Sequence, residues 1–482
     1  MQRSLIQDSG QRAPGRWLSP VLLVSLLTYF FAFSWDRVFM RFAADDMMNM
    51  GIYFRMGPWR ALASQFLFWQ NWYRPMGAAF YMPLHHWFGL NPMPFQAAIV
   101  GILAINLCLG FGLLRVLGCG RVAAGLASLI TGYHAGLANL HYNIDMVYDV
   151  LCFLFFAGTL LCYVSIRSQK RSLRWPETAL FLALYLCALN SKEMALTIPF
   201  VILSYEVIYH RPFRNLMQWL RGPGILVAAT GVLAAVDFFG KRFGPDALMN
   251  NAAYQPVFSL QRWIDFQKGS LHDLLCYTNV TTAGVILVWL LATFLAWRRD
   301  QPALRFAWAY MVLTPLPIAF LSDRFQGCLY IPLLGWAVLA SMTFTDLAQS
   351  VSNYLAKAAV FRRAGAQRLF AIFVAAAVIL WAREMTRLKA SVVVPAAAQQ
   401  GIETWDVIQQ LQALHPHVQP NSKVVFLNDP FTDWDMTFIG MLWFHDRSVE
   451  VHNARLEHLA GADLNRMDYA FDFRDGKLVQ LK

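Results

Sequence analysis

The sequence predicts an all-α polytopic membrane protein of about eleven transmembrane helices, followed by a small C-terminal α/β domain. Hydrophobic residues make up 57% of the 482 positions and charged residues only 14%, whereas a soluble domain carries about 25% charged residues. The mean hydropathy is +0.41. The net charge of +11 would suggest nucleic acid in a soluble protein, but most Lys and Arg lie in short loops between apolar runs. This placement indicates membrane orientation and lipid as a partner, and it argues against a nucleic-acid partner.

Apolar runs of about helix length recur along most of the chain. A helix needs about 20 apolar residues to cross a bilayer. The expected spans are 17–36, 95–116, 122–141, 146–166, 177–190, 194–209, 222–239, 282–297, 303–321, 328–345 and 369–385. Arg3, Arg12 and Arg16 precede the first run and no small-residue cleavage site follows it, so we expect a retained signal-anchor helix.

The loops between these runs alternate in charge. With the N-terminus inside, every inside loop is basic: 115–121, 167–174, 210–221, 298–305 and 357–368. Positive loops stay on the cytoplasmic side of a membrane. An odd number of spans then places the C-terminus outside. We expect a multi-pass protein of the bacterial inner membrane, with its active site and C-terminus extracytoplasmic. The seven cysteines show no paired spacing, so neither a disulfide framework nor a metal cluster is expected.

Two long segments fall on the expected outer side, 37–94 and 240–281. Residues 75–88 are apolar but short, and they include Pro83 and the pair His85-His86. Counting them as a span would move the basic 167–174 loop outside, so we expect a re-entrant or interfacial helix. The two histidines are either metal ligands or residues at the wet interface. The second segment, with Tyr254 among its aromatic residues, is expected to be a lid or a substrate-contacting loop.

The composition of the tail predicts two domains, a transmembrane domain over 1–386 and an extracytoplasmic domain over 387–482. Residues 401–414 have helical apolar spacing. Lys423-Val-Val-Phe-Leu427 is typical of a strand ended by Asn428-Asp-Pro. Residues 441–444 and 449–451 are expected to be further strands.

The adjacent carboxylates Asp45 and Asp46 follow the first apolar run. Such a pair beside a membrane span is costly unless it binds a cation, meets a partner or handles protons. The alternative is a solvated loop with two ordinary acids. The expected topology places on the same side Arg74, the turn with Lys192 and Glu193, and the turn with Asp323 and Arg324. Carboxylates beside guanidinium groups suit a reaction in which one group takes a proton and another holds an anionic leaving group. Arginine is the usual partner of a phosphate, because its planar fork donates two parallel hydrogen bonds.

Four motifs in order resemble those of a known superfamily: Ala44-Asp-Asp-Met47; Trp72-Tyr-Arg-Pro-Met76; Leu189-Asn-Ser-Lys-Glu-Met194 with Pro199 and Tyr205-Glu206; and Ser322-Asp-Arg-Phe-Gln-Gly-Cys-Leu-Tyr-Ile-Pro-Leu333. The chain resembles the GT-C membrane glycosyltransferases, in the branch similar to protein O-mannosyltransferases and their bacterial polyprenyl-phosphate-sugar-dependent relatives. The resemblance covers about residues 17–345. The last motif departs from the usual Arg-Tyr-Leu-x-x-Pro run, because Phe325-Gln-Gly-Cys-Leu-Tyr330 lengthens it.

The resemblance implies transfer of a hexosyl or pentosyl group from a polyprenyl-phosphate donor to an extracytoplasmic protein, lipid or glycan, with inversion. It implies three catalytic carboxylates. Asp45 would be the general base on the acceptor hydroxyl. Asp46 would support it or help hold a divalent cation, although the sequence does not establish that any cofactor is required. Glu193 would orient a cationic side chain.

The resemblance also implies a phosphate site. Arg324 would hold the lipid phosphate, assisted by Arg74 or Lys192. A simple ion pair within the helix turn is the alternative for Lys192 and Glu193. For the whole chain the alternatives are a transporter or flippase for a lipid-linked or anionic substrate, a scaffold without catalysis, and a polymerase or ligase of lipid-linked glycans.

Overall fold

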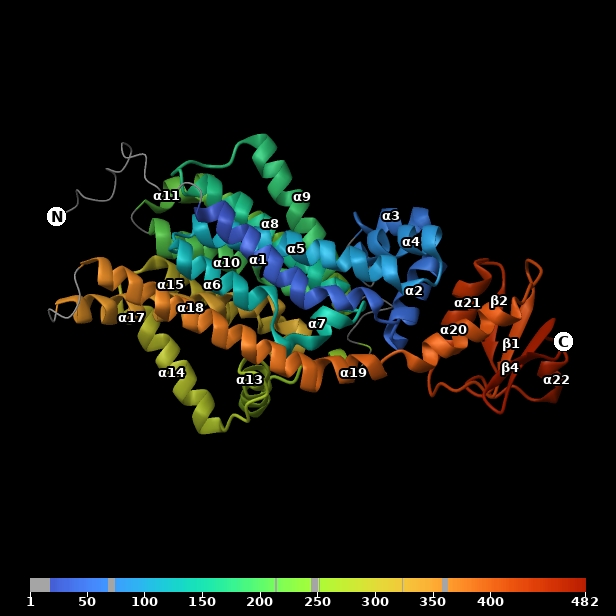
Figure 1. The fold of residues 1–482 in the computed structure, drawn as a ribbon. Helices are drawn as coiled ribbons and strands as arrows, with labels where there is room; N and C mark the ends of the chain where they lie inside the picture. The colour runs from blue at the N-terminus through green and yellow to red at the C-terminus, as the bar shows by residue number, and fades with distance from the viewer. Residues whose placement is uncertain are drawn as a thin grey trace.

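The structure is a computed structural model, and it describes residues 18–67, 74–212, 215–243, 250, 252–322, 324–357 and 363–482. Figure 1 shows an elongated helical bundle with a small β-sheet at one end. We call the end of the bundle that meets this sheet the sheet end, and the opposite end the distal end. The predicted fold class is confirmed: a polytopic helical bundle carries a small C-terminal sheet domain.

Helices occupy all of the expected spans. The longest are α1 (Leu18–Ser34), α5 (Pro92–Val116), α8 (Val147–Arg167), α9 (Trp175–Ser191), α12 (Ile225–Phe243), α14 (Thr282–Arg298), α17 (Tyr330–Lys357) and α18 (Arg363–Leu388). Within the described residues, six helical stretches are long and apolar enough to cross a membrane by length and composition. The central helix α8 is buried along most of its length and packs mainly against α5 and α9.

Three of the expected spans are broken toward the sheet end. α6 (Arg121–Gly132) ends early and is followed by α7 (Ala138–Tyr142). α10 (Ile198–Tyr205) begins only after the short 3₁₀-helix η4 (Glu193–Thr197), and α15 (Pro302–Leu313) stops before α16 (Leu316–Ala319). Proline lacks an N–H donor and disfavours helix in the residue before it, which explains the break at Pro315. Irregular backbone at membrane depth is tolerated where it lines a polar cavity.

The sheet end also carries α2 (Ala44–Met56), α3 (Pro58–Ser64) and α4 (Met76–Phe88). These helices lie side by side near the C-terminal domain (Figure 1). α4 is too short to span a bilayer, as predicted for residues 75–88. Trp59 and Trp87 project from this group with more than two thirds of their surface exposed, which suits a membrane interface. η9 (Ala252–Tyr254) and α13 (Leu260–Leu274) come from the second long segment.

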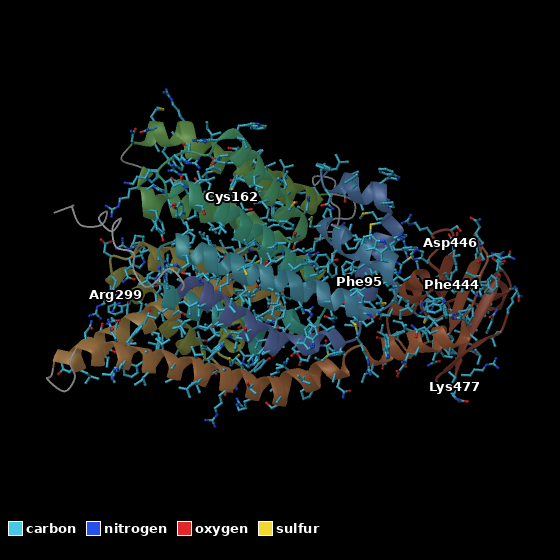
Figure 2. All side chains as sticks on the ribbon, turned by 45° about the horizontal axis from the view of Figure 1, so that its top comes forward. Phe95, Cys162, Arg299, Phe444, Asp446 and Lys477 are labelled. Carbon is cyan, nitrogen blue, oxygen red and sulfur yellow. The ribbon has the colours of Figure 1, made fainter. Side chains whose placement is uncertain are left out.

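The C-terminal sheet domain (402–482) has the strand order β2-β1-β3-β4. β1 (Lys423–Leu427) is parallel to β2 (Glu450–Asn453) and β3 (Tyr469–Arg474), and β4 (Lys477–Gln480) is antiparallel to β3. Its helices are α20 (Ile402–Leu414), α21 (Asp435–Phe444) and α22 (Gly461–Leu464). Figure 2 shows Asp446 and Lys477 of this domain far from Arg299 at the distal end.

The predictions for this domain are confirmed for the helix over 401–414 and for the strands at Lys423–Leu427 and 449–451. The strand predicted over 441–444 is wrong, because these residues form the end of α21. A short apolar run can be either a buried strand or a buried helix. α21 is apolar all round because it is covered on two sides. Gly440 faces Phe426 of the sheet, and Phe438 faces Gly51 of α2.

Candidate functional site

A cavity of about 200 Å³ lies at the sheet end, where six segments distant in sequence meet. The polar residues that line it are Asp45, Asn49, Arg74, Asp145, Tyr148, Asp149, Lys192, Glu193, Tyr254 and Arg324. Five of the six site residues predicted from the sequence are therefore brought together: Asp45, Arg74, Lys192, Glu193 and Arg324. The exception is Asp46.

Asp45 and Asp46 differ in environment although they are neighbours on the first turn of α2. Asp45 is exposed and lines the cavity. Asp46 is fully buried, and its Oδ2 accepts a hydrogen bond of 2.7 Å from the backbone N–H of Ala43, which caps the start of α2. Burial and then the charge of Asp145 raise the pKa of Asp46. Its other carboxylate oxygen has no hydrogen-bond partner among the described residues.

Two acids that were not predicted from the sequence also line the cavity. Asp145 lies in the turn before α8, and Asp149 lies in the first turn of that helix. Burial raises the pKa of Asp145 to about 7, and the charges of Asp45 and Asp149 act in the same direction. Asp145 is thus a carboxyl group that can exchange a proton near neutral pH, beside the exposed carboxylate of Asp45.

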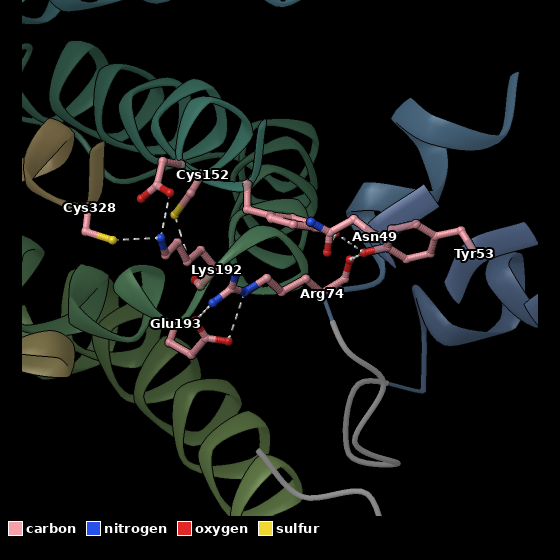
Figure 3. Close-up of polar contacts among 9 residues, drawn as sticks. Asn49, Tyr53, Arg74, Cys152, Lys192, Glu193 and Cys328 are labelled. Carbon is pink, nitrogen blue, oxygen red and sulfur yellow. Dashed lines mark hydrogen bonds and ion pairs between the residues drawn. The ribbon is translucent and has the colours of Figure 1, made fainter. Parts of the chain in front are cut away.

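Lys192 enters the cavity because α9 ends at the preceding residue and the backbone becomes extended there, with φ −162° and ψ 153°. Its ammonium donates to Asp149 Oδ2 at 2.6 Å and to Cys328 Sγ at 3.3 Å (Figure 3). Burial alone would lower the pKa of Lys192, but the Asp149 carboxylate outweighs that effect, so the pKa is raised. Lys192 therefore remains charged.

Arg74 and Glu193 form a second ion pair on the cavity wall. Arg74 Nη2 lies 3.1 Å from Glu193 Oε2, and its Nε lies 3.5 Å from Oε1 (Figure 3). Lys192 and Glu193 thus pair with different partners and not with one another. Through this ion pair Glu193 holds the guanidinium of Arg74.

A hydrogen bond from α2 and a cation–π contact with α8 fix the position of Arg74. Its backbone has φ +39°, an unfavourable value for a residue with a Cβ. The Tyr53 hydroxyl donates to the Arg74 carbonyl at 2.8 Å and lies 3.0 Å from the Tyr148 hydroxyl, which donates to Asn49 Oδ1. The Arg74 guanidinium also lies 5.0 Å above the Tyr148 ring. A side chain at Gly77 would overlap the Tyr53 hydroxyl, so glycine is required there.

Arg324 lies across the cavity, with its guanidinium 4.5 Å above the ring of Tyr254. None of the carboxylates that the structure describes forms an ion pair with Arg324. Tyr254 comes from the segment 240–281, so this segment contributes to the cavity wall. Three motif residues, Trp72, Tyr73 and Asp323, lie outside the described residues.

Arg37 supports the turn that carries Asp145. It is fully buried and donates to Gln96 Oε1 and to the carbonyl oxygens of Leu140 and Asn143, at 2.9 and 2.8 Å for the two carbonyls. These carbonyls come just before Asp145 in the chain, so Arg37 fixes the backbone of the turn.

The side chains at the cavity differ from those of a divalent-cation site. Within the described part of the chain, no three carboxylate, imidazole or thiol groups are arranged to hold a metal ion. Asp46, the candidate ligand, uses one oxygen in its helix cap and does not line the cavity. The described residues therefore do not fit a divalent cation at Asp46, and the proposed reaction uses none.

No protein-family profile matches the sequence, and no curated protein matches it. Solved structures do resemble the fold. ArnT from Cupriavidus metallidurans, bound to undecaprenyl phosphate, is 14% identical with a TM-score of 0.51, over 96% of this chain and 94% of that chain. The Archaeoglobus fulgidus oligosaccharyltransferase, tethered to an acceptor peptide, is 10% identical with a TM-score of 0.54, over 95% of this chain and 69% of that chain.

These findings define a polytopic membrane protein with a polar cavity where its helices meet a small sheet domain. The chain shares its fold with these two proteins, both of which are GT-C glycosyltransferases, the superfamily that its motifs resemble.

Proposed function

We propose that this protein is an integral-membrane glycosyltransferase that moves a sugar from a polyprenyl-phosphate donor to an extracytoplasmic acceptor, with inversion. The observation that carries the proposal is the presence of two groups on one cavity: the exposed carboxylate of Asp45 and the guanidinium of Arg324, unpaired among the described residues. Further support comes from the two similar folds, since one holds undecaprenyl phosphate and the other an acceptor peptide.

In the proposed reaction, an acceptor hydroxyl oxygen bonds to the anomeric carbon while the bond from that carbon to the phosphate oxygen breaks. Asp45 takes the proton of the attacking hydroxyl, because it is the exposed acid of the cavity. Attack opposite the leaving phosphate inverts the anomeric centre. Asp145, whose pKa lies near 7, stands beside Asp45 and tunes its affinity for that proton. Asp46 acts indirectly in this scheme, by capping the helix that presents Asp45.

The leaving phosphate gains negative charge and needs cations that are not already neutralised. Arg324 suits this role best, and its planar fork can donate two hydrogen bonds to a phosphate. Arg74 and Lys192 already carry carboxylate partners at 3.1 and 2.6 Å. They would add positive potential around the phosphate and fewer direct contacts.

The orientation and the domain division follow as part of the proposal. The basic loops, including Arg299 at the distal end (Figure 2), would face the cytoplasm of a bacterial inner membrane. The cavity and the domain over 387–482 would then face outward. In this arrangement the transmembrane domain over 1–386 carries the chemistry, and the outer domain positions the acceptor.

The function is tested by mass analysis of surface glycans and proteins from cells that lack the gene and carry a plasmid copy. The wild-type copy should restore a glycan of defined added mass, and Asp45→Asn should not. Asp475→Asn, at an exposed turn of the sheet domain, is the matched control and should restore the glycan fully. Equal glycan profiles with and without the gene would contradict the proposal.

A further inference from the structure

A second cavity, of about 310 Å³, lies at the seam between α2, α4 and the sheet domain. It is separate from the first cavity. α2 divides the two, because Asp45 and Asn49 line the first, whereas Met50 and Phe54 line the second. We call this second space the seam cavity. Its aromatic and polar lining includes Phe54, Tyr81, His85, Trp87, His445 and Arg447.

The walls of the seam cavity are tightly packed across the two domains. The Phe54 ring lies 5.5 Å from the ring of His85 and 5.5 Å from that of His445, measured between centroids. Arg447 Nε donates to the Phe54 carbonyl at 2.6 Å, and its guanidinium lies 5.2 Å above the Phe54 ring. The cavity is therefore preformed. A ligand that binds in a preformed cavity loses little free energy to the ordering of side chains.

His85 has an unused hydrogen-bonding atom. Only 3% of this residue is exposed, and its Nε2 has no hydrogen-bond partner among the described residues. A buried polar atom without a partner costs about 1–3 kcal/mol. Such atoms are rare in native folds, so each one calls for a partner that would satisfy it. That atom has almost no exposed surface, so a ligand in the seam cavity would supply the partner after a small rotation of the His85 ring.

The lining also selects the chemistry of the ligand. None of the described residues that line this cavity carries a carboxylate, which disfavours a cationic ligand. The three histidines at the seam are His85, His86 and His445, and within the described residues no such group is arranged to hold a metal ion. What remains are aromatic rings beside imidazole and guanidinium nitrogens. A sugar matches this combination, because its C–H faces pack on aromatic rings while its hydroxyls exchange hydrogen bonds with nitrogen groups.

We propose that the seam cavity binds a saccharide unit of the acceptor, on the opposite side of α2 from the transfer site. This inference rests on the proposed function for its identification of the acceptor as a glycan. The exposed Trp87 would close one side of the sugar, and His85 would bind a hydroxyl in the buried part of the cavity. The site would thus recognise a sugar that is not itself the reacting unit.

The test is saturation-transfer NMR on the full-length protein in detergent, with methyl α-mannoside, methyl β-glucoside, N-acetylglucosamine and glucuronic acid as separate probes. At least one probe should receive saturation from the wild type. His85→Phe, which keeps a ring but removes Nε2, should lower that signal at least fivefold. Trp87→Ala should lower it as well, and it is not expected to affect folding because its side chain is exposed. Trp59→Ala, which changes a still more exposed tryptophan of α3, is the matched control and should leave the signal unchanged.

Two outcomes would overturn the inference. One is that no probe receives saturation from the wild type. The other is that a signal appears but survives in both seam variants. Asp45→Asn should keep the signal, since it lies outside the seam cavity. Failure of the proposed function would look different: transfer would persist in Asp45→Asn, whatever the seam variants do.

Discussion

Lys192 and Asp149 form a buried ion pair, with 2.6 Å between Nζ and Oδ2, which joins the end of α9 to the start of α8. Both side chains are at most 6% exposed. Removing one partner of such a pair leaves an uncompensated charge in the interior and lowers the free energy of unfolding by about 3–5 kcal/mol. The pair therefore stabilises the wall of the cavity and also contributes charge to it.

We predict that Lys192→Met and Asp149→Asn each lower the free energy of unfolding by about 3–5 kcal/mol. The double variant should lose less than the sum, because no lone charge is left. Unfolding in mixed detergent micelles measures this. Arg171→Met, which breaks the partly exposed pair between Arg171 and Glu177, is the control and should have a much smaller effect. Additive losses in the double variant would contradict the coupling.

The raised pKa of Asp145 predicts how stability depends on pH. The folded protein holds this proton up to about pH 7, whereas the unfolded chain releases it near 3.8. The stability contributed by the protonated group is present at low pH and is lost as pH rises toward 7. Relative to Asp145→Asn, the wild type should thus become less stable between about pH 4 and pH 7. Melting curves at several pH values check this, and a pH-independent difference would contradict it.

The close approach at Gly77 gives a third prediction. A Cβ there would overlap the Tyr53 hydroxyl and come within 2.6 Å of the Tyr148 ring, so Gly77→Ala should cost about 1–3 kcal/mol. It should also disturb Arg74, which these tyrosines hold. Gly101→Ala is the control, because nothing lies within 4 Å of a Cβ at Gly101. In that helix interior alanine should be neutral or stabilise by roughly 0.5–1 kcal/mol. Equal effects of the two changes would show that the tyrosines do not restrict the site.

Arg324 is predicted to bind the lipid phosphate. Arg324→Ala should weaken the binding of undecaprenyl phosphate by about 1.5–3 kcal/mol, the range for a lost hydrogen bond to a charged group. Arg324→Lys should restore only part of this, because an ammonium lacks the planar fork. Titration of the purified protein with undecaprenyl phosphate measures both. Unchanged affinity for undecaprenyl phosphate in Arg324→Ala would contradict this prediction and would indicate that Arg74 or Lys192 binds the phosphate instead.

Much of the fold could be predicted from the sequence, because apolar runs of helix length mark the positions of the long helices. The breaks in 122–141, 194–209 and 303–321 could not be predicted from hydropathy, which does not register where a helix unwinds. The error at 441–444 has a similar cause. An apolar run covered on both sides has the same composition in a strand and in a helix.

The cavity was also predictable in large part, since charged turns on one side of a bundle must lie near one another. Asp145 and Asp149 were not predicted as site residues. They flank the start of an apolar run, and a short turn followed by a transmembrane span accounts for that stretch without a functional site. Asp149 did leave a signal, as an ionisable residue inside an expected span usually marks a functional site. The separate environments of Asp45 and Asp46 depend on which side of α2 faces the core, and this only the structure shows.

The central claim is that Asp45 is the base and Arg324 the phosphate ligand, and one paired measurement tests it most directly. Transfer from a polyprenyl-phosphate sugar and binding of undecaprenyl phosphate are measured side by side for Asp45→Asn and Arg324→Ala. Asp45→Asn should lower turnover by roughly 10²–10⁴-fold with nearly normal lipid binding, whereas Arg324→Ala should lower lipid binding first. Normal turnover in Asp45→Asn would contradict the account.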